Sequence, residues 1–280
     1  MPYIERSNGP TIHYEIDDYT DPWKKAPVLL LQHGFSRSSC LWYSWVPYLS
    51  RYYRVVRPDL RGLGRSSTET GKPPKLGLDA YFSDLHAIID DVGADSVHYC
   101  GESFGGILGM AFAGECPERI RTLSLIAAPV FISDYDKTST TYGYSSRIDA
   151  IRGMGARAWA EASNAGRRFP TDGDPGMLNW FVEEMGKGDV EVLVAMFQWV
   201  SQFSAAPYLP RIIAPVLGLY PSSGPVTDDE QLALLKAHVH NLKLVLLPTR
   251  YHAIQIMQPA TCALHVLHFA GQHDGIACHE

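Results

Sequence analysis

The stretch Tyr99-Cys100-Gly101-Glu102-Ser103-Phe104-Gly105-Gly106 carries a Gly-x-Ser-x-Gly motif, and its surroundings decide the fold that we expect. Residues 96–100 before it are typical of a buried strand, and the small residues of 105–114 predict a helix. A serine in this strand-turn-helix setting lies on a sharp turn that lifts its hydroxyl above the sheet edge. The helix N-terminus favours negative charge on a bound carbonyl oxygen. Ser103 is therefore predicted to be a catalytic nucleophile.

Buried strands and helices alternate along most of the 280 residues. Strands are expected over residues 11–16, 27–32, 53–59, 96–100, 123–127, 214–220 and 242–247. Helices are expected between them over residues 42–49, 78–92 and 105–114, and at the end over 259–270. This alternation predicts an α/β fold with a mostly parallel central sheet and helices on both faces.

The alternation stops in the middle of the chain, where helices are expected over residues 147–169, 174–186 and 190–203 with no strand between them. We expect residues 1–129 and 209–280 to form the core and residues 130–208 to form an inserted helical cap. Trp159, Trp180 and Trp199 lie in this stretch. They either pack within a helical layer or line an apolar substrate pocket, and they are candidate substrate-binding residues on the second interpretation.

A serine nucleophile needs a base, and His252 is the best candidate among eleven histidines. It follows the last predicted strand and so belongs to a loop at the sheet edge where ligands bind in such folds. It would take the proton of Ser103 and return it to the leaving group. Two closely spaced histidine pairs, 238/240 and 265/268, lack a nearby cysteine or carboxylate cluster, so no metal site is predicted.

The overall composition points to a globular protein that acts on a small molecule. The net charge of −6 and the pI of about 6.0 give no electrostatic reason to bind nucleic acid or an anionic membrane. Residues 1–6 lack the pattern of a signal peptide, and the apolar runs are too short to span a bilayer. Five scattered cysteines favour reduced thiols, so we expect a cytoplasmic location. The sequence does not indicate an oligomeric state.

Four segments of the first half resemble the α/β-hydrolase fold superfamily, in particular its capped lactonases, esterases and carbon–carbon bond hydrolases. They are His33-Gly34-Phe35, residues 58–66, residues 99–106 and residues 117–120. The resemblance implies an oxyanion hole formed by the backbone N–H groups of Phe35 and Phe104, and no cofactor. It also implies that residues 130–208 form the cap. The related epoxide hydrolases and haloalkane dehalogenases carry an aspartate where this chain has Ser103.

The third member of the catalytic triad is missing from its usual place. After the strand at 214–220 the family places an aspartate, and this chain has Gly224 there. No acid follows the strand at 123–127 either. The nearest carboxylates belong to Asp134, Asp136, Asp228 and Asp229, of which Asp134 is the candidate acid. A Ser–His dyad oriented by Ser222 or Ser223 is the alternative.

For three charged residues, the sequence alone favours a structural or surface role. Glu102 is expected to be bonded to neighbouring backbone, with an acid of raised pKa near the site as the alternative. Arg167 and Arg168 are expected to be solvated surface charges.

The sequence as a whole predicts a serine hydrolase that cleaves an ester, lactone or amide bond of a medium-sized, fairly apolar small molecule through an acyl-serine intermediate. One alternative is a cofactor-free lyase, carbon–carbon bond hydrolase or dioxygenase that uses His252 as the base. Another is a hydrolase-like receptor that binds a small molecule without turning it over.

Overall fold

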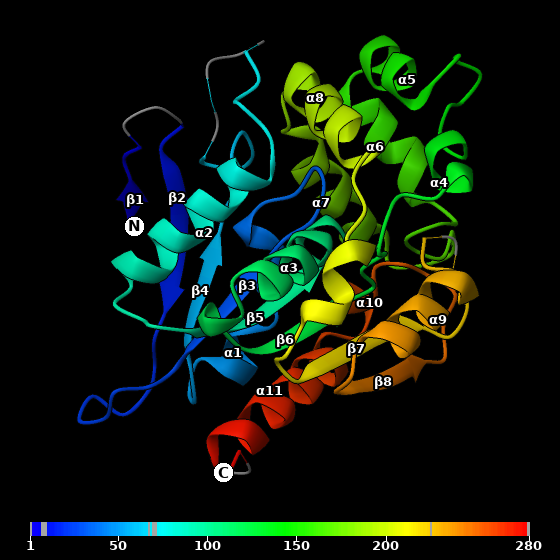
Figure 1. Ribbon diagram of the computed structural model, residues 1–280. Helices are drawn as coiled ribbons and strands as arrows, with labels where there is room; N and C mark the ends of the chain where they lie inside the picture. Colours follow the sequence, from blue (N-terminus) through cyan, green and yellow to red (C-terminus); the bar gives the residue numbers. More distant parts are fainter. Residues whose placement is uncertain (1, 7–9, 67, 69–71, 225, 279–280) are drawn as a thin grey trace.

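A single sheet of eight strands runs through the computed structural model, which describes residues 2–6, 10–66, 68, 72–224 and 226–278 (Figure 1). The strands are β1 (Tyr3–Ile4), β2 (Ile12–Asp17), β3 (Val28–Gln32), β4 (Arg54–Pro58), β5 (Val97–Glu102), β6 (Ile120–Ile126), β7 (Val216–Pro221) and β8 (Leu242–Leu247). Their order is β1-β2-β4-β3-β5-β6-β7-β8. Strands β3 to β8 pair in parallel, whereas β2 is antiparallel to β4 and β1 to β2.

The strand order changes direction at β3 and β5, and this places the site. From β3 the chain steps outward to β4 on one side, and then crosses back to β5 on the other side. Loops that leave the carboxyl ends of β3 and β5 therefore diverge, and ligands of open α/β sheets bind in the crevice between them. Every residue of both strands is buried, which fits a parallel sheet covered on both faces.

Helices cover both faces of the sheet. Helices α2 and α3 contact each other, α3 packs on β5 and β6, and α1 contacts α11 (Figure 1). The helices of the core are η1 (Ser39–Trp42), α1 (Val46–Leu49), α2 (Leu78–Asp91), α3 (Phe104–Glu115), η2 (Pro117–Arg119), η3 (Ala206–Arg211), α9 (Asp229–His238), α10 (Ile254–Met257) and α11 (Pro259–Asp274). The fold class predicted from the sequence is confirmed.

Five consecutive helices lie between β6 and β7 and sit together above the carboxyl ends of the strands (Figure 1). They are α4 (Asp134–Thr138), α5 (Arg147–Met154), α6 (Ala156–Asn164), α7 (Pro175–Gly186) and α8 (Val190–Val200). We call them the cap helices. Helix α6 packs against α7, and α5 against α8.

Two of the expected helices differ in the structure, and β1, α4, α9 and α10 were not predicted. The helix expected over 147–169 is two helices, because Gly155 between them has a φ of 80°, which is incompatible with a continuous α-helix. The helix expected over 42–49 is reduced to η1 and the single turn of α1.

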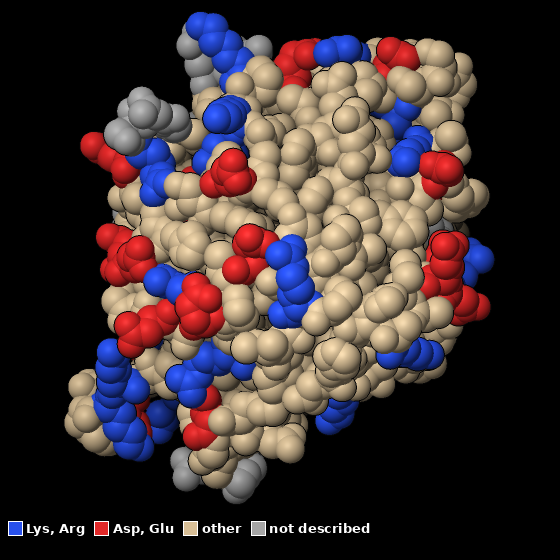
Figure 2. Space-filling view, in the orientation of Figure 1, with Lys and Arg blue, Asp and Glu red and all other residues tan. Residues whose placement is uncertain are grey.

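On the surface, acidic and basic side chains are interspersed over the face seen in Figure 2.

Candidate active site

Ser103 occupies a strained turn between β5 and α3. Its φ and ψ of 51° and −116° lie outside the regions that a non-glycine residue adopts easily. The Ser103 N–H donates to the carbonyl of Ile126 at 3.0 Å, which ties the turn to β6. The side chain remains partly exposed although its neighbours in sequence are buried. This geometry is compatible with the predicted nucleophile at a sheet edge.

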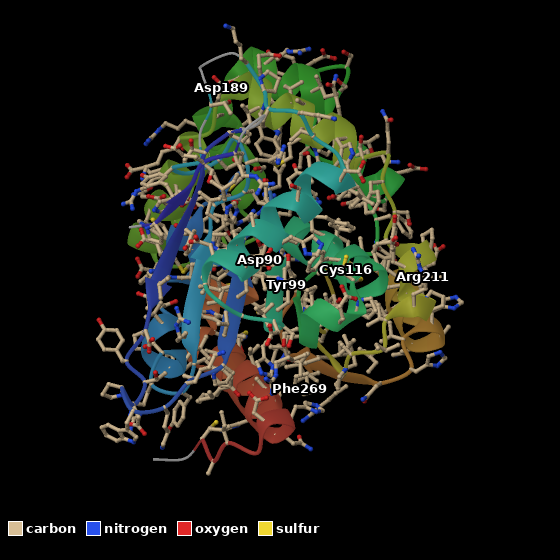
Figure 3. All side chains as sticks on the ribbon, turned by 60° about the vertical axis from the view of Figure 1, so that its left-hand side comes forward. Asp90, Tyr99, Cys116, Asp189, Arg211 and Phe269 are labelled. Carbon is tan, nitrogen blue, oxygen red and sulfur yellow. The ribbon has the colours of Figure 1, made fainter. Side chains whose placement is uncertain are left out.

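Small residues and one tyrosine hold this turn in place. A Cβ added to Gly105 would lie 2.5 Å from the carbonyl oxygen of Gln32, and one on Gly101 would lie 2.5 Å from that of Gly105. Helix α3 therefore approaches β3 and β5 more closely than a side chain at position 101 or 105 would permit. Tyr99, seen beside α3 in Figure 3, donates its hydroxyl hydrogen to the carbonyl of Gly105 at 2.8 Å.

His252 lies between β8 and α10, and only 3% of it is exposed. Its backbone N–H donates to the carbonyl of Arg167 at 3.3 Å, and the N–H of Ala253 donates to that of Arg168 at 3.2 Å. The segment between α6 and α7 therefore bonds to the loop of the histidine through its main chain. Burial lowers the pKa of His252 well below its usual value, and the charge of Arg168 adds to this effect. This shift favours the neutral form of the imidazole.

Glu102 is the carboxylate that faces His252. Its Oε1 lies 3.6 Å from Nε2 of His252 and 3.7 Å from Nη2 of Arg37, and the side chain is fully buried. Burial raises the pKa of Glu102, while the charges of Arg37 and Arg168 oppose the rise. The position of Glu102 fits the second interpretation, an acid of raised pKa near the site, while a hydrogen bond with the Gly34 backbone also opposes the rise in pKa.

The candidate acid Asp134 is wrongly placed for a triad. Its side chain is 97% exposed at the start of α4 and pairs with Lys137 at 2.9 Å, so it points to solvent and not to a buried imidazole. Asp136 is buried but pairs with Arg147 and Arg167. Asp228 caps α9 by accepting from the N–H of Gln231.

The remaining alternatives near the usual position of the acid are neutral groups. The hydroxyl of Ser222 donates to the carbonyl of Thr249 at 3.3 Å. This hydroxyl is therefore already bonded to the backbone of the loop that precedes His252. A Cβ on Gly224 would lie 3.6 Å from the carbonyl oxygen of Arg250, two residues before His252. The loop after β7 thus borders the histidine loop but brings no carboxylate to it.

Phe35 and Phe104 follow β3 and β5, the two strands that flank the switch point. Phe104 is the first residue of α3, where the N–H has no acceptor within the helix. No acceptor for the Phe35 N–H is found among the residues that the structure describes. These observations are compatible with the predicted role of both N–H groups in an oxyanion hole.

Two of the three predicted tryptophans lie against these phenylalanines. The ring of Trp159 is 6.0 Å from that of Phe35, and the ring of Trp199 is 5.9 Å from that of Phe104. Trp180 instead packs against Tyr43 at 5.1 Å, and Tyr43 is 59% exposed. The structure therefore brings Trp159 and Trp199 to the phenylalanines that follow β3 and β5, and places Trp180 toward the surface.

Arg167 and Arg168 are part-buried and bonded within the protein, and are not the free surface charges that were expected. Nη1 of Arg168 donates to the carbonyl of Ser163 at 2.8 Å, and its pKa is lowered well below the usual value by burial and by the neighbouring cations, Arg37 foremost. Arg167 pairs with Asp136 and is 12% exposed. Sequence patterns missed these residues because adjacent charges look alike whether they face solvent or the interior.

No group of three His, Cys, Asp or Glu side chains suited to a metal ion occurs among the described residues. Within the same part of the chain, no helix is both long enough and apolar enough to cross a membrane.

The fold and the turn at Ser103 place this protein in a known class. Residues 27–259 match the family described as alpha/beta hydrolase fold, and the chain belongs to that family.

Individual relatives share its length to different degrees. The 3-oxoadipate enol-lactonase 2 of Acinetobacter baylyi is 24% identical over 83% of this chain and 84% of its own. The 2-hydroxy-6-oxo-2,4-heptadienoate hydrolase of Pseudomonas putida is 34% identical, but the match covers only 45% of this chain and 46% of its own. Among solved structures, a hydrolase from Pseudomonas aeruginosa PA01 is 25% identical with a TM-score of 0.82, covering 96% of this chain and 98% of that one. The family and these relatives identify the chain as a hydrolase.

Proposed function

We propose that the protein is a serine hydrolase that cleaves an ester or lactone bond, or less readily an amide, through an acyl-serine intermediate. The observation that carries the proposal is the backbone of Ser103, whose φ of 51° presents a hydroxyl at the switch point of the sheet. The enol-lactonase named among the relatives supports the choice of an ester or lactone.

The residues of the site support a two-stage reaction. Ser103 Oγ attacks the carbonyl carbon while His252 accepts the hydroxyl proton, and the backbone N–H groups of Phe35 and Phe104 stabilise the oxyanion. The tetrahedral intermediate collapses, and His252 gives its proton to the leaving oxygen. Water then attacks the acyl-serine with His252 as the base, which releases the acid and restores Ser103.

The cap has a place in this proposal. Residues 130–208 would form a cap over the carboxyl ends of the strands, and the rings of Trp159 and Trp199 would line an apolar wall of the pocket. The main-chain bonds from His252 and Ala253 to the cap support this role, because they tie the base to the cap.

A fluorophosphonate probe tests the nucleophile directly. We expect covalent labelling of Ser103 in the wild type and loss of both labelling and ester hydrolysis in Ser103→Ala. Ser201→Ala is the control, since the hydroxyl of Ser201 bonds only to the carbonyl of Gln198 at the end of α8. Labelling at another residue, or wild-type turnover in Ser103→Ala, would refute the proposal.

A second candidate function rests on the absence of an acid beside His252 other than Glu102 among the described residues. In that case His252 abstracts a proton from the substrate and Ser103 only donates a hydrogen bond, as in a cofactor-free lyase or carbon–carbon bond hydrolase. Substrate turnover that survives Ser103→Ala but not His252→Ala would favour this chemistry.

A further inference from the structure

Strand β8 forms one edge of the sheet, and its outer side is open. It pairs with β7, and no other described strand lies beside it. The opposite edge is formed by β1, which has two residues, whereas β8 has six. Native proteins usually shorten, charge or cover such edges, because unpaired backbone groups can recruit another strand. The long edge at β8 is therefore the one that can accept a further strand.

The backbone groups of β8 divide between β7 and the open side. The N–H groups of Val216 and Ser222 donate to the carbonyls of Asn241 and Leu247, each at 2.8 Å, so the odd-numbered residues of β8 face β7. Successive residues of a strand direct their N–H and C=O groups to opposite sides, so the even-numbered residues direct theirs outward. These outward residues are Leu242, Leu244 and Leu246. Each of them offers one donor and one acceptor on the open side.

The same three leucines also present apolar side chains. They share one face of the sheet, because side chains alternate along a strand. Leu246 is 46% exposed, and Leu244 is half-buried beside Gly218 of β7, where an added Cβ would lie 3.0 Å from its Cδ1. Lys243 is the one charged residue of β8 and belongs to the other face. The apolar face of β8 therefore extends to the open edge without a charge to block pairing.

Two copies of β8 can satisfy these groups by pairing in an antiparallel orientation. When Leu244 lies opposite its counterpart, Leu242 of each copy lies opposite Leu246 of the other. All three outward leucines then form hydrogen-bonded pairs, in which each residue donates one bond and accepts one. Lys243 lies opposite Val245 in this register, so no two like charges meet.

The neighbouring registers are less favourable. Sliding one strand by two residues in one direction places Lys243 directly opposite the second Lys243, and like charges in that position are destabilising. Sliding it by two residues in the other direction places Pro248 opposite Leu242, where proline has no N–H to donate. The sequence of β8 thus favours the register centred on Leu244.

Helix α9 favours the same orientation through its charges. It connects β7 to β8 and lies over this end of the sheet (Figure 1). Its first turn carries Asp229 and Glu230, and its last turn carries Lys236 and His238; all four are exposed. A two-fold axis through Leu244, perpendicular to the sheet, makes the two α9 helices antiparallel. The acidic end of each helix then lies toward the basic end of the other, which is electrostatically complementary.

We propose that the outer edge of β8 binds the β8 strand of a second copy of this chain, antiparallel and centred on Leu244, to form a dimer with one continuous sheet. A second copy is the partner because the edge donors, the apolar face and the charged ends of α9 are all complementary to themselves under this one rotation. The dimer does not depend on the reaction that the protein catalyses, so its tests need no substrate.

Sedimentation velocity on the full-length chain tests the dimer directly. We expect the wild type to pass from a monomer of 31.1 kDa to a species of twice that mass as its concentration rises from about 0.1 to about 100 μM. Leu246→Pro removes an outward donor from each copy but no bond to β7, and proline is tolerated in an edge strand at such a position. It should weaken the dimer at least about tenfold and keep a cooperative melting transition.

A second variant and a control separate loss of pairing from loss of folding. Leu246→Lys leaves the backbone donors in place but puts a charge on the apolar face, and it too should weaken the dimer at least about tenfold. Ile16→Lys is the matched control, because Ile16 is a 37% exposed strand residue of β2, near the opposite edge of the sheet. The control should dimerise like the wild type.

Disulfide cross-linking tests the register. Leu244→Cys and Leu246→Cys are each made in a Cys40→Ser background, which removes an exposed thiol, and are oxidised with glutathione disulfide. Residues of a hydrogen-bonded antiparallel pair have Cα atoms about 5.5 Å apart, which a disulfide can span. Leu244→Cys should therefore give a cross-link between the two copies of position 244. Leu246→Cys should not, because position 246 faces position 242.

Three results would overturn the proposal. A wild type that remains monomeric at about 100 μM would show that a second copy does not occupy the edge. Dimerisation unchanged in folded Leu246→Pro and Leu246→Lys would place the contact on another surface. A cross-link formed by Leu246→Cys and not by Leu244→Cys would reject the pairing centred on Leu244.

Discussion

Replacing Glu102 by glutamine should slow the reaction strongly while keeping the shape of the side chain. On the proposed mechanism His252 becomes a cation in the transition state, and its Nε2 lies 3.6 Å from Oε1 of Glu102. Coulomb's law at an effective dielectric of about 20 gives roughly 4–5 kcal/mol for two opposite unit charges at that separation. An interaction of that size corresponds to about 10³-fold in rate.

Two features of the site reduce this figure. Arg37, 3.7 Å from the same oxygen, opposes the His252 cation, and the raised pKa of Glu102 leaves less of it ionised. We therefore expect kcat of Glu102→Gln to fall by roughly 10²- to 10³-fold, with a smaller change in KM.

The assay is steady-state hydrolysis of a 4-nitrophenyl ester, followed over pH, with the melting temperature of each variant as a check on folding. Glu115→Gln is the matched control: it removes a carboxylate from the other end of α3, where Glu115 pairs with Arg211 and both are half exposed. Glu102→Asp should recover part of the lost rate. A folded Glu102→Gln with kcat within about threefold of the wild type would refute the electrostatic role of Glu102.

Two further predictions concern the pH dependence set by His252. Burial and the neighbouring arginines lower the pKa of His252, so the acidic limb of the kcat/KM profile should have its midpoint below pH 6.5. Arg168→Gln removes one of these cations and should move the midpoint to higher pH. Arg152→Gln is the control and should leave the midpoint unchanged, because Arg152 pairs with Glu191. A wild-type midpoint above 6.5 would contradict this. Gly224→Asp places a carboxylate on the loop that borders Arg250, and should likewise raise the midpoint, with Ser223→Asp as the neighbouring control. An unchanged profile in Gly224→Asp would show that this loop cannot supply an acid to His252.

Local sequence patterns predicted the parts of the site that are built from residues adjacent in the chain. The turn at Ser103 follows from a strand, a glycine-flanked serine and a helix in succession, and each of these is a property of neighbouring residues. The choice of Phe35 and Phe104 rested on the family resemblance, and the structure places them after β3 and β5. The nucleophile, base and oxyanion hole remain functional predictions, for which the structure supplies compatible geometry.

The roles of the charged residues could not be read from the sequence. Asp134 was the candidate acid, but it lies in solvent, and Glu102 beside the nucleophile is the carboxylate that faces His252. Arg167 and Arg168 looked like surface charges, although they pack against the loop of the base.

The sequence by itself determined the order of strands and helices and the turn that carries Ser103, because these depend on hydrophobic periodicity and on local backbone requirements. Only the tertiary structure decided which charges surround His252. The energy of a charge depends on its burial and on partners far away in the chain. Arg37, Glu102 and His252 lie at or after the ends of three different strands, Arg168 lies between α6 and α7, and only the folded chain brings their charges together.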